Sequence, residues 1–289
     1  MRRYILAGLI LLFSIYSVSA QALLNSGESP LGVTAVAETG FVKILVHQIT
    51  IGDPVSGNTR FDYVREGGQE ILFPFSRYSA ELSIGDRHTL VFLYQPLLIQ
   101  SQVWFQEARV IDGETFAADE GVNITYSFPF YRASYLYDFF AQDNVELSAG
   151  VSMQLRNASV RFESTDGGTV VATQDLGLVP IIKVRGEYRF ANTAVPGVFV
   201  GAEVDGFYAS SAFFNGADFE FTGSILDASV RAGFRPTNGV EVFLNVRALA
   251  GGATGTRPAE DRVFWTQSRD GYTDNILSSL SVTLGARLR

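Results

Sequence analysis

The residues with the most chemical potential in this sequence are acids and bases that recur at every second position. Between 182 and 190 the even positions are apolar or glycine, whereas the odd positions are Lys183, Arg185, Glu187 and Arg189. Successive side chains of a β-strand point to opposite faces, so these four charges share one face. Charges that leave water need partners. Such a face can pair with opposite charges of neighbouring strands or line a polar path for small solutes.

The same alternation recurs over most of the C-terminal half of the chain. In 145–156, 198–205, 227–234, 240–250 and 280–288 one face is apolar and the other is polar or charged. We therefore predict one network of charged residues on the polar face, formed by Glu146, Arg156, Lys183, Arg185, Glu187, Arg189, Glu203, Asp205, Asp227, Arg231, Glu241, Arg247 and Arg287. Both signs are present in similar number. A salt-bridge plug that rigidifies the fold and a polar pathway for small solutes are both consistent with this composition.

Residues suited to catalysis or metal binding are scarce. The chain has no cysteine, which excludes thiol nucleophiles, disulfides, thiolate metal sites and a lipoprotein anchor. The two histidines, His47 and His88, lie in the middle of one expected strand and at an expected tight turn, where an ordinary structural role is favoured. The acidic loops 112–120 and 260–274 match no compact calcium-binding loop. We therefore expect a non-enzymatic protein without cofactor or metal.

Aromatic residues form two further sets. One set lies in two long loops, where it either packs over the end of the fold or binds a ligand or partner: Phe213, Phe214, Phe219, Phe264, Trp265 and Tyr272. The other set lies near strand ends, where aromatic rings form girdles at the two surfaces of a membrane: Tyr126, Tyr137, Phe139, Phe140, Tyr188 and Phe190. The first set is the candidate binding site of the loops.

The first twenty residues predict export. Two arginines precede the apolar run 5–18, and Val18-Ser19-Ala20 offers the small residues that signal peptidase accepts. We expect cleavage after Ala20 and a short periplasmic lead-in over 21–40, followed by one domain over 41–289. No later apolar run is long enough for a membrane-spanning helix, so further membrane insertion requires β-strands. With 22 basic and 30 acidic residues the formal charge is −8, which argues against nucleic acid as a partner.

Alternation and turn signals predict strands at 41–51, 71–84, 88–106, 121–137, 145–162, 176–190, 197–210, 222–235, 239–250 and 275–289. The connections between them are alternately long and short, as in up-and-down barrels with tight turns at one end. The expected fold is all-β, a closed antiparallel transmembrane barrel of about ten strands, with eight or twelve as alternatives. The apolar parity changes near Pro129, which predicts a β-bulge there. The connection 163–175 is expected to be one of the long loops.

In these features the chain resembles the small bacterial outer-membrane β-barrel proteins, the broad class that holds the OmpA-type and OmpW-type barrels. The closing segment 281–289 partly matches the assembly signal of that class through Thr283, Gly285 and Leu288, although it ends on Arg289 where an aromatic is usual. The resemblance implies a location in the bacterial outer membrane, with its lipid and the barrel-assembly machinery as partners.

The resemblance also frames the expected function. Together with the charged face it favours a non-enzymatic barrel with a charged lumen that stabilises the envelope or acts as a narrow channel for a small solute. The alternative is a surface adhesin-like protein that binds a ligand through its aromatic and acidic extracellular loops.

Overall fold

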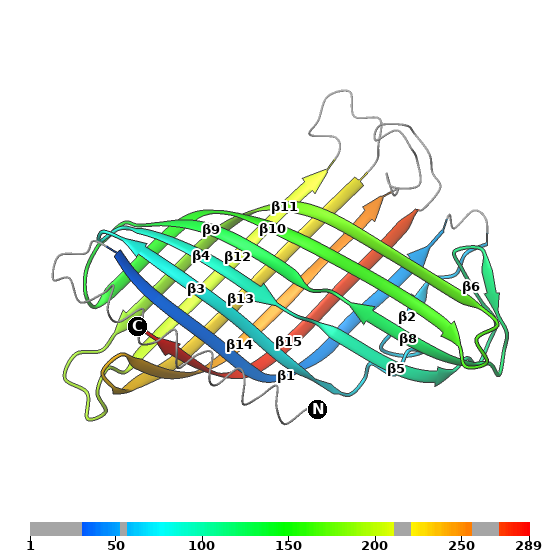
Figure 1. The fold of residues 1–289 in the computed structure, drawn as a ribbon, viewed down its shortest axis with the longest axis horizontal. Coiled ribbons are helices and arrows are strands. Elements are labelled where there is room, and N and C mark those ends of the chain that lie inside the picture. Colours follow the sequence, from blue (N-terminus) through cyan, green and yellow to red (C-terminus); the bar gives the residue numbers. More distant parts are fainter. Residues whose placement is uncertain (1–30, 53–56, 211–220, 256–271) are drawn as a thin grey trace.

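Ten long strands form a closed antiparallel barrel in the computed structural model (Figure 1). The structure describes residues 31–52, 57–210, 221–255 and 272–289. In order around the wall the strands are β1 (Leu31–Ile51), β3 (Leu72–Ile84), β4 (His88–Gln95) continued by β5 (Leu98–Trp104), β8 (Gly121–Ser127) continued by β9 (Phe130–Asp138), β10 (Val145–Ser164), β11 (Val170–Arg189), β12 (Phe199–Ser210), β13 (Phe221–Thr237), β14 (Val240–Gly255) and β15 (Thr273–Leu288). β15 pairs with β1 and closes the ring. The prediction of a closed ten-stranded barrel is confirmed.

The two ends of the barrel differ in their connections. The turn end carries the short connections 85–87, 139–144, 190–198 and 238–239, together with the first described residue, Leu31, and the C-terminus. The loop end carries the other connections, 52–71, 105–120, 165–169, 211–220 and 256–272. Among the described residues no helix is long and apolar enough to cross a membrane.

The fifth connection is shorter than the sequence predicts. The expected long loop 163–175 is wrong, because β10 continues to Ser164 and β11 begins at Val170. Two hydrogen bonds close the turn between them. The Thr169 amide donates to the Ser164 hydroxyl oxygen at 2.9 Å, and the Ser164 amide donates to the Thr169 carbonyl oxygen at the same distance. Ser159, Arg161 and Glu163 face outward on β10, and these polar residues make the end of the strand look like a loop in the sequence.

β1 also differs from its predicted limits. The expected lead-in 21–40 is wrong for residues 31–40, which pair with β3 on one side and, from Ala35, with β15 on the other. Position 40 accommodates only glycine, because a Cβ atom there would lie 2.1 Å from the Val282 carbonyl oxygen. A bulge between Ile44 and Val46 then shifts the register against β15. The bulge explains why both faces of 41–51 look mixed in the sequence.

A band of exposed apolar side chains surrounds the wall. Leu147, Val151, Met153 and Leu155 mark it on β10. The other strands contribute Phe41 and Leu45, Tyr78, Phe92, Tyr131 and Tyr135, Leu178, Ile182 and Val184, Val200 and Val204, Leu226 and Val230, Leu244 and Val246, and Leu280, Val282 and Leu284. The nine residues from Leu147 to Leu155 match the length that a tilted strand needs to cross a bilayer. Such a band is typical of a wall that faces lipid.

Aromatic rings lie at the turn-end margin of this band. Phe139, Phe140, Tyr188 and Phe190 are all exposed, and Tyr188 packs edge-on against Phe190. The prediction for Tyr126 is wrong, because this ring is buried inside the barrel.

Beyond the apolar band the two faces of the wall exchange character. On β10 the outward residues become Ser159 and Arg161, while Val160 and Phe162 are buried inside. On β8 the apolar residues are likewise inside, and Asn123 is exposed outside. At the loop end β8 and β10 therefore have an apolar interior and a polar exterior, as in a water-soluble protein.

This exchange corrects the predicted bulge at Pro129. Ser127 pairs with Ser159 and Phe130 with Arg156, so both strands advance by the same number of residues and none is inserted. Even-numbered residues face inward on both sides of Pro129, from Val122 to Leu136. The apolar parity shifts because the surroundings of the wall change, while the strand keeps its orientation.

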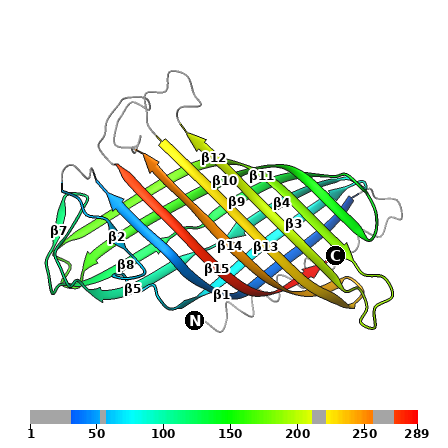
Figure 2. The ribbon, with the colours of Figure 1, turned by 180° about the vertical axis from the view of Figure 1, so that it is seen from behind.

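An apolar core packs the loop end on the side of β1, β5, β8 and β10. It packs Phe61 and Tyr63, near the short strand β2 (Phe61–Asp62), against Phe162, with ring centroids 5.1 Å and 5.8 Å from it. The hairpin β6 (Arg109–Ile111) and β7 (Glu114–Phe116) adds two buried side chains. Figure 2 shows β2, β5, β7 and β8 together at this end.

Asp62 organises the segment that carries this core. Although burial favours its neutral form, hydrogen bonds from Gln48 and from the backbone amides of Val64 and Arg65 hold the pKa of the Asp62 carboxyl below its ordinary value. The charged carboxylate thus fixes the turn that follows β2.

The position of the apolar band predicts opposite outcomes for one substitution at two outward positions of β10. Val151→Arg should impair assembly into lipid vesicles, because a cation near the bilayer midplane costs about 2–4 kcal/mol. Ser159→Arg lies on the same face beyond the band and should assemble as the wild type does. Folding yields, read from heat-modifiable migration in gels, measure both. Equal yields for Val151→Arg and the wild type would show that this face does not meet lipid.

Candidate functional site

The structure places the predicted charged residues on the inner face of the barrel. Lys183, Arg185, Glu187, Asp205, Asp227, Glu241, Arg247 and Arg287 are buried, and Glu146, Arg189, Glu203 and Arg231 keep part of their surface accessible. They gather in the half of the lumen nearest the turn end. Arg156 lies above them, with its guanidinium 5.9 Å from the ring centre of Phe128, and forms no described ion pair with the network.

Two aspartates form the centre of this network. Arg132 of β9 lies 2.6 Å from an Asp205 oxygen and 3.3 Å from an Asp227 oxygen. Lys183 contacts the same Asp205 oxygen at 3.2 Å, and Arg77 contacts Asp227 at 3.3 Å. All five side chains are 6 % exposed or less, so each charge depends on these partners in place of water.

A second group of ion pairs lies at the turn end. Arg287 bridges two acids, 3.0 Å from Glu187 and 2.8 Å from Glu241. Arg189 contacts Glu241 at 2.7 Å, and Arg231 contacts Glu187 at 3.0 Å. Each acid is therefore held by several guanidinium groups. The planar fork of N–H donors in arginine is well suited to binding a carboxylate in this way.

Two further residues connect these groups to the rest of the wall. Arg185 donates to Glu146 at 2.6 Å and to both carboxylate oxygens of Glu81 at 3.0 Å. Glu203 lies 2.5 Å from Lys183 and 3.4 Å from Arg247. The network thus extends over the whole turn-end half of the lumen.

Several of these pairs cross the lumen. Arg185 on β11 reaches Glu81 on β3, and Arg132 on β9 reaches Asp205 on β12, although neither pair of strands is adjacent in the wall. Arg77 on β3 likewise reaches Asp227 on β13. Such contacts require the side chains to span the interior, so the charges fill the space between the walls.

The charges balance among the described residues of this region. Its bases are Arg77, Arg132, Lys183, Arg185, Arg189, Arg231, Arg247 and Arg287, and its acids are Glu38, Glu81, Glu146, Glu187, Glu203, Asp205, Asp227 and Glu241. At the rim Arg235 and Arg289 also approach Glu241. A balanced interior has no excess of one sign that would attract a particular ion.

The N-terminal half supplies residues that the predicted site lacks. Arg77, Glu81 and Arg132 all belong to the network, and Glu38 accepts hydrogen bonds from Thr283 at 2.7 Å and Asn245 at 2.8 Å. The signal for Arg77 and Glu81 is present in the sequence, because both share the polar face of the strand 77–84. Extending the parity rule to that strand would have found them.

The histidines lie apart from this network. His47 is fully buried, stacks on Tyr63 with ring centroids 3.9 Å apart and shares a 2.8 Å hydrogen bond with the Gln69 side-chain oxygen. His88 is exposed at the turn end and bonds the Tyr135 hydroxyl at 2.8 Å.

The loop aromatics stay largely a prediction. Phe213, Phe214, Phe219, Phe264 and Trp265 lie outside the described residues. Tyr272 is described, and its carbonyl accepts a 2.8 Å hydrogen bond from the Gly52 amide.

The closed barrel, its apolar band and its polar lumen define the fold of the bacterial outer-membrane β-barrels. No protein-family profile matches the chain, and no curated protein matches its sequence. Among solved structures the chain is similar to the Escherichia coli outer membrane protease OmpT, with 9 % identity over 89 % of this chain and 96 % of that one and a TM-score of 0.52.

Two other solved structures are similar at lower scores. The transport unit of the autotransporter AIDA-I from Escherichia coli has 8 % identity, covers 92 % of each chain and gives a TM-score of 0.42. A Pseudomonas aeruginosa FadL homologue has 10 % identity over 89 % of this chain and 90 % of that one, with a TM-score of 0.38. The likeness to OmpT concerns the fold alone, and no single family is assigned.

The central ion pairs predict a large loss of stability on removal of one partner. Arg132→Ala should lower the free energy of unfolding by about 3–5 kcal/mol, because Asp205 and Asp227 then stay buried with fewer cations. Arg161→Ala is the control, since Arg161 pairs with Glu163 on the exposed outer surface and its loss should leave stability unchanged. Urea unfolding in detergent, followed by tryptophan fluorescence, measures both. A similar small effect for the two variants would contradict the proposed importance of the network.

Proposed function

We propose that this protein is a sealed outer-membrane barrel that stabilises the envelope and leaves no open aqueous path through its turn-end half. The observation that carries the proposal is the set of ion pairs that cross the lumen, above all Arg185 with Glu81 and Arg132 with Asp205. These pairs join strands that are not neighbours in the wall, at hydrogen-bond distance. In an open channel these charges would be separated by water and would not contact each other directly.

The outer-membrane location is part of this proposal. It is supported by the fold, by the apolar band and by the signal sequence expected at residues 1–20, which lie outside the described residues. Passage through the barrel-assembly machinery and contact with outer-membrane lipid follow from that location.

A narrow solute channel is the competing function, and the energetics disfavour it. A permeating ion would have to displace charges that are paired in a region with little water. Breaking one such buried pair costs about 3–5 kcal/mol, and several would have to open in series. The balanced signs also provide no selective attraction for either cations or anions.

We further propose that the protein is not an enzyme. OmpT is a protease, but the residues of this chain provide little support for proton transfer. His47 is enclosed by aromatic rings and hydrogen-bonded to an amide, and His88 lies at the turn end, far along the barrel from the loops. A general base needs both reach to a substrate and a partner that orients it.

Conductance in planar lipid bilayers tests the sealed lumen. The wild type should insert without resolvable current steps. Arg132→Ala combined with Arg185→Ala should admit a cation-selective leak, because the acids Glu81 and Asp205 remain after their cations are removed. Heat-modifiable migration confirms that this variant is folded. Stable current steps from the wild type would overturn the proposal in favour of a channel.

A further inference from the structure

The hydrogen-bond ladder between β11 and β12 ends before either strand does. Its last pair is Ile182 with Gly206, yet β11 extends to Val170 and β12 to Ser210. β11 stays paired with β10 and β12 with β13 along these extensions. Figure 1 shows the two strands side by side at the turn end and pointing apart at the loop end. Within the described residues the wall is therefore split at this position.

The split begins inside the apolar band. Pro180, two residues beyond the last pair, is exposed on the outer face, and Leu178 and Tyr208 are 67 % and 54 % exposed. Proline has no amide hydrogen to donate, and it is found on strands whose edge has no partner. The sequence at this point is thus compatible with an unpaired edge.

A second split in the described part of the wall lies between β3 and β5, and its surroundings differ from those of the first. The last pair of β3 with β4 on this side is Tyr78 with Tyr94, and β5 pairs only with β8. There the segment 61–69 lies across the inner side: β2 pairs with β1, and a Cβ atom on Gly68 would lie 3.2 Å from Val103 of β5. That split is covered from inside, whereas no described segment is hydrogen-bonded across the split between β11 and β12.

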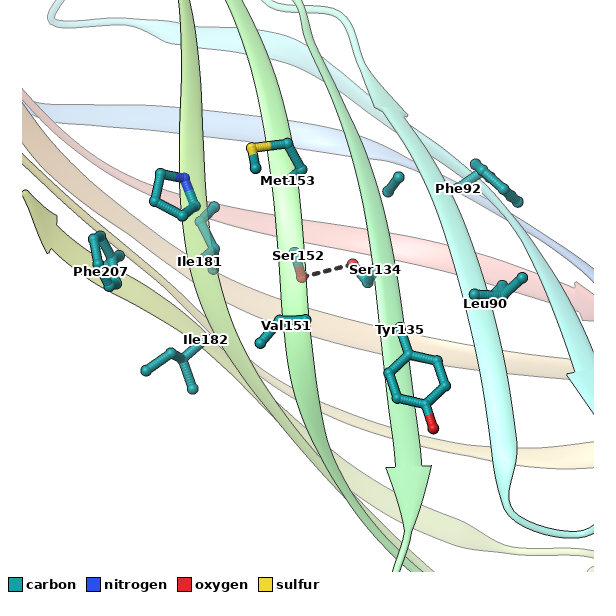
Figure 3. Close-up of a pocket in the computed structure, with 12 residues that line it drawn as sticks. Leu90, Phe92, Ser134, Tyr135, Val151, Ser152, Met153, Ile181, Ile182 and Phe207 are labelled. Carbon is teal, nitrogen blue, oxygen red and sulfur yellow. Dashed lines mark hydrogen bonds between the residues drawn. The ribbon is translucent and has the colours of Figure 1, made fainter.

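A hollow in the outer wall leads to the split. It has a volume of 430 Å³ and crosses β4, β9, β10 and β11 as far as β12. Figure 3 shows Val151 and Met153 in its middle and Phe207 at its edge, beside Ile181 and Ile182. Its lining is almost wholly apolar and is continuous with the band that faces lipid. Phe207 has the parity of the buried Asp205, so its ring belongs to the inner face and yet reaches this outer hollow.

The inner surface behind the split is also apolar. Ile181 of β11 is buried there, and Val179, Ala209 and Ile225 share its inward parity on β11, β12 and β13. On the turn-end side of this level the lumen is closed by Lys183 and Asp205, whose charged groups lie 3.2 Å apart. A molecule that enters through the split thus contacts apolar side chains, and the charged network limits how far it extends toward the turn end.

We propose that the split between β11 and β12 is a lateral entry through which one acyl chain of an outer-leaflet lipid passes into the loop-end lumen. This inference rests on the outer-membrane location proposed above. The occupant is a lipid because the hollow is continuous with the lipid-facing band and offers an alkyl chain apolar contacts on both sides of the wall. The polar ester and head group of the same lipid lie at the level of the unpaired strand edges, where they and water replace the missing ladder partners.

Quenching of tryptophan by brominated acyl chains tests the entry. In a full-length chain with Trp104→Phe and Trp265→Phe, single tryptophans are placed by Phe207→Trp at the split, Val204→Trp on the lipid face and Phe130→Trp inside an intact wall. In vesicles of dibrominated phosphatidylcholine, Phe207→Trp should lose a fraction of its fluorescence comparable with Val204→Trp, and Phe130→Trp should lose little. Unquenched Val204→Trp would overturn the membrane location itself. Quenched Val204→Trp with unquenched Phe207→Trp would overturn the entry alone.

A second substitution separates entry from contact at the outer surface. Ala209→Phe fills the inner side next to the split and should reduce the quenching of Phe207→Trp, whereas Ala202→Phe, outward on the same strand, should not. Unchanged quenching with Ala209→Phe would show that the ring meets lipid only from outside and would overturn the proposal. Quenching of Phe207→Trp by aqueous acrylamide in place of the brominated lipid would identify a water-filled split, which also overturns it.

Discussion

Closure of the backbone ladder is the constraint on which the rest of this structure depends. A wall surrounded by lipid has no water to satisfy free amide and carbonyl groups, so its strands must pair on both sides. Pairing of β1 with β15 achieves this around the turn-end half. Once the ring is closed, every residue of a strand faces either lipid or lumen, and the alternation of the sequence becomes an alternation of environment.

Charged residues on the inward parity then have to find one another. The lumen is narrow, so Arg132, Asp205 and Asp227, from three different strands, meet at hydrogen-bond distance. Polar neutral side chains complete the arrangement: Gln154 accepts two bonds from the Arg132 guanidinium at 2.9 Å and 2.7 Å, and Gln95 accepts one from Arg77 at 2.8 Å. These hydrogen bonds to glutamine orient each guanidinium group independently of its carboxylate partners. The network is therefore specific in geometry as well as balanced in charge.

Much of this arrangement follows from the sequence, and three of the exceptions share one cause. Alternation shows which residues share a face, so the thirteen predicted charges do lie on one side of the wall. It does not show whether the outside is lipid or water. Val122, Ile124 and Tyr126 share the inward side with Arg132 although their chemistry is opposite, because the outer surface near them is no longer apolar. The predicted bulge at Pro129, the girdle role of Tyr126 and the long loop at 163–175 all fail for this reason.

The positions of the prolines are a separate indication of where the surroundings change. Pro129 and Pro96 interrupt neighbouring strands at the same register, Pro180 lies just beyond the last pair of β11 with β12, and Pro74 lies beyond the last pair of β3 with β4. Each removes a backbone donor from the wall. In hydrocarbon such a loss has no remedy, whereas at the lipid head groups water supplies the missing partner. Pro96 and Pro129, at one register of neighbouring strands, are therefore best explained if this level is the outer margin of the membrane, where the same strands pass from a lipid-facing wall with a polar interior to a water-facing wall with an apolar one.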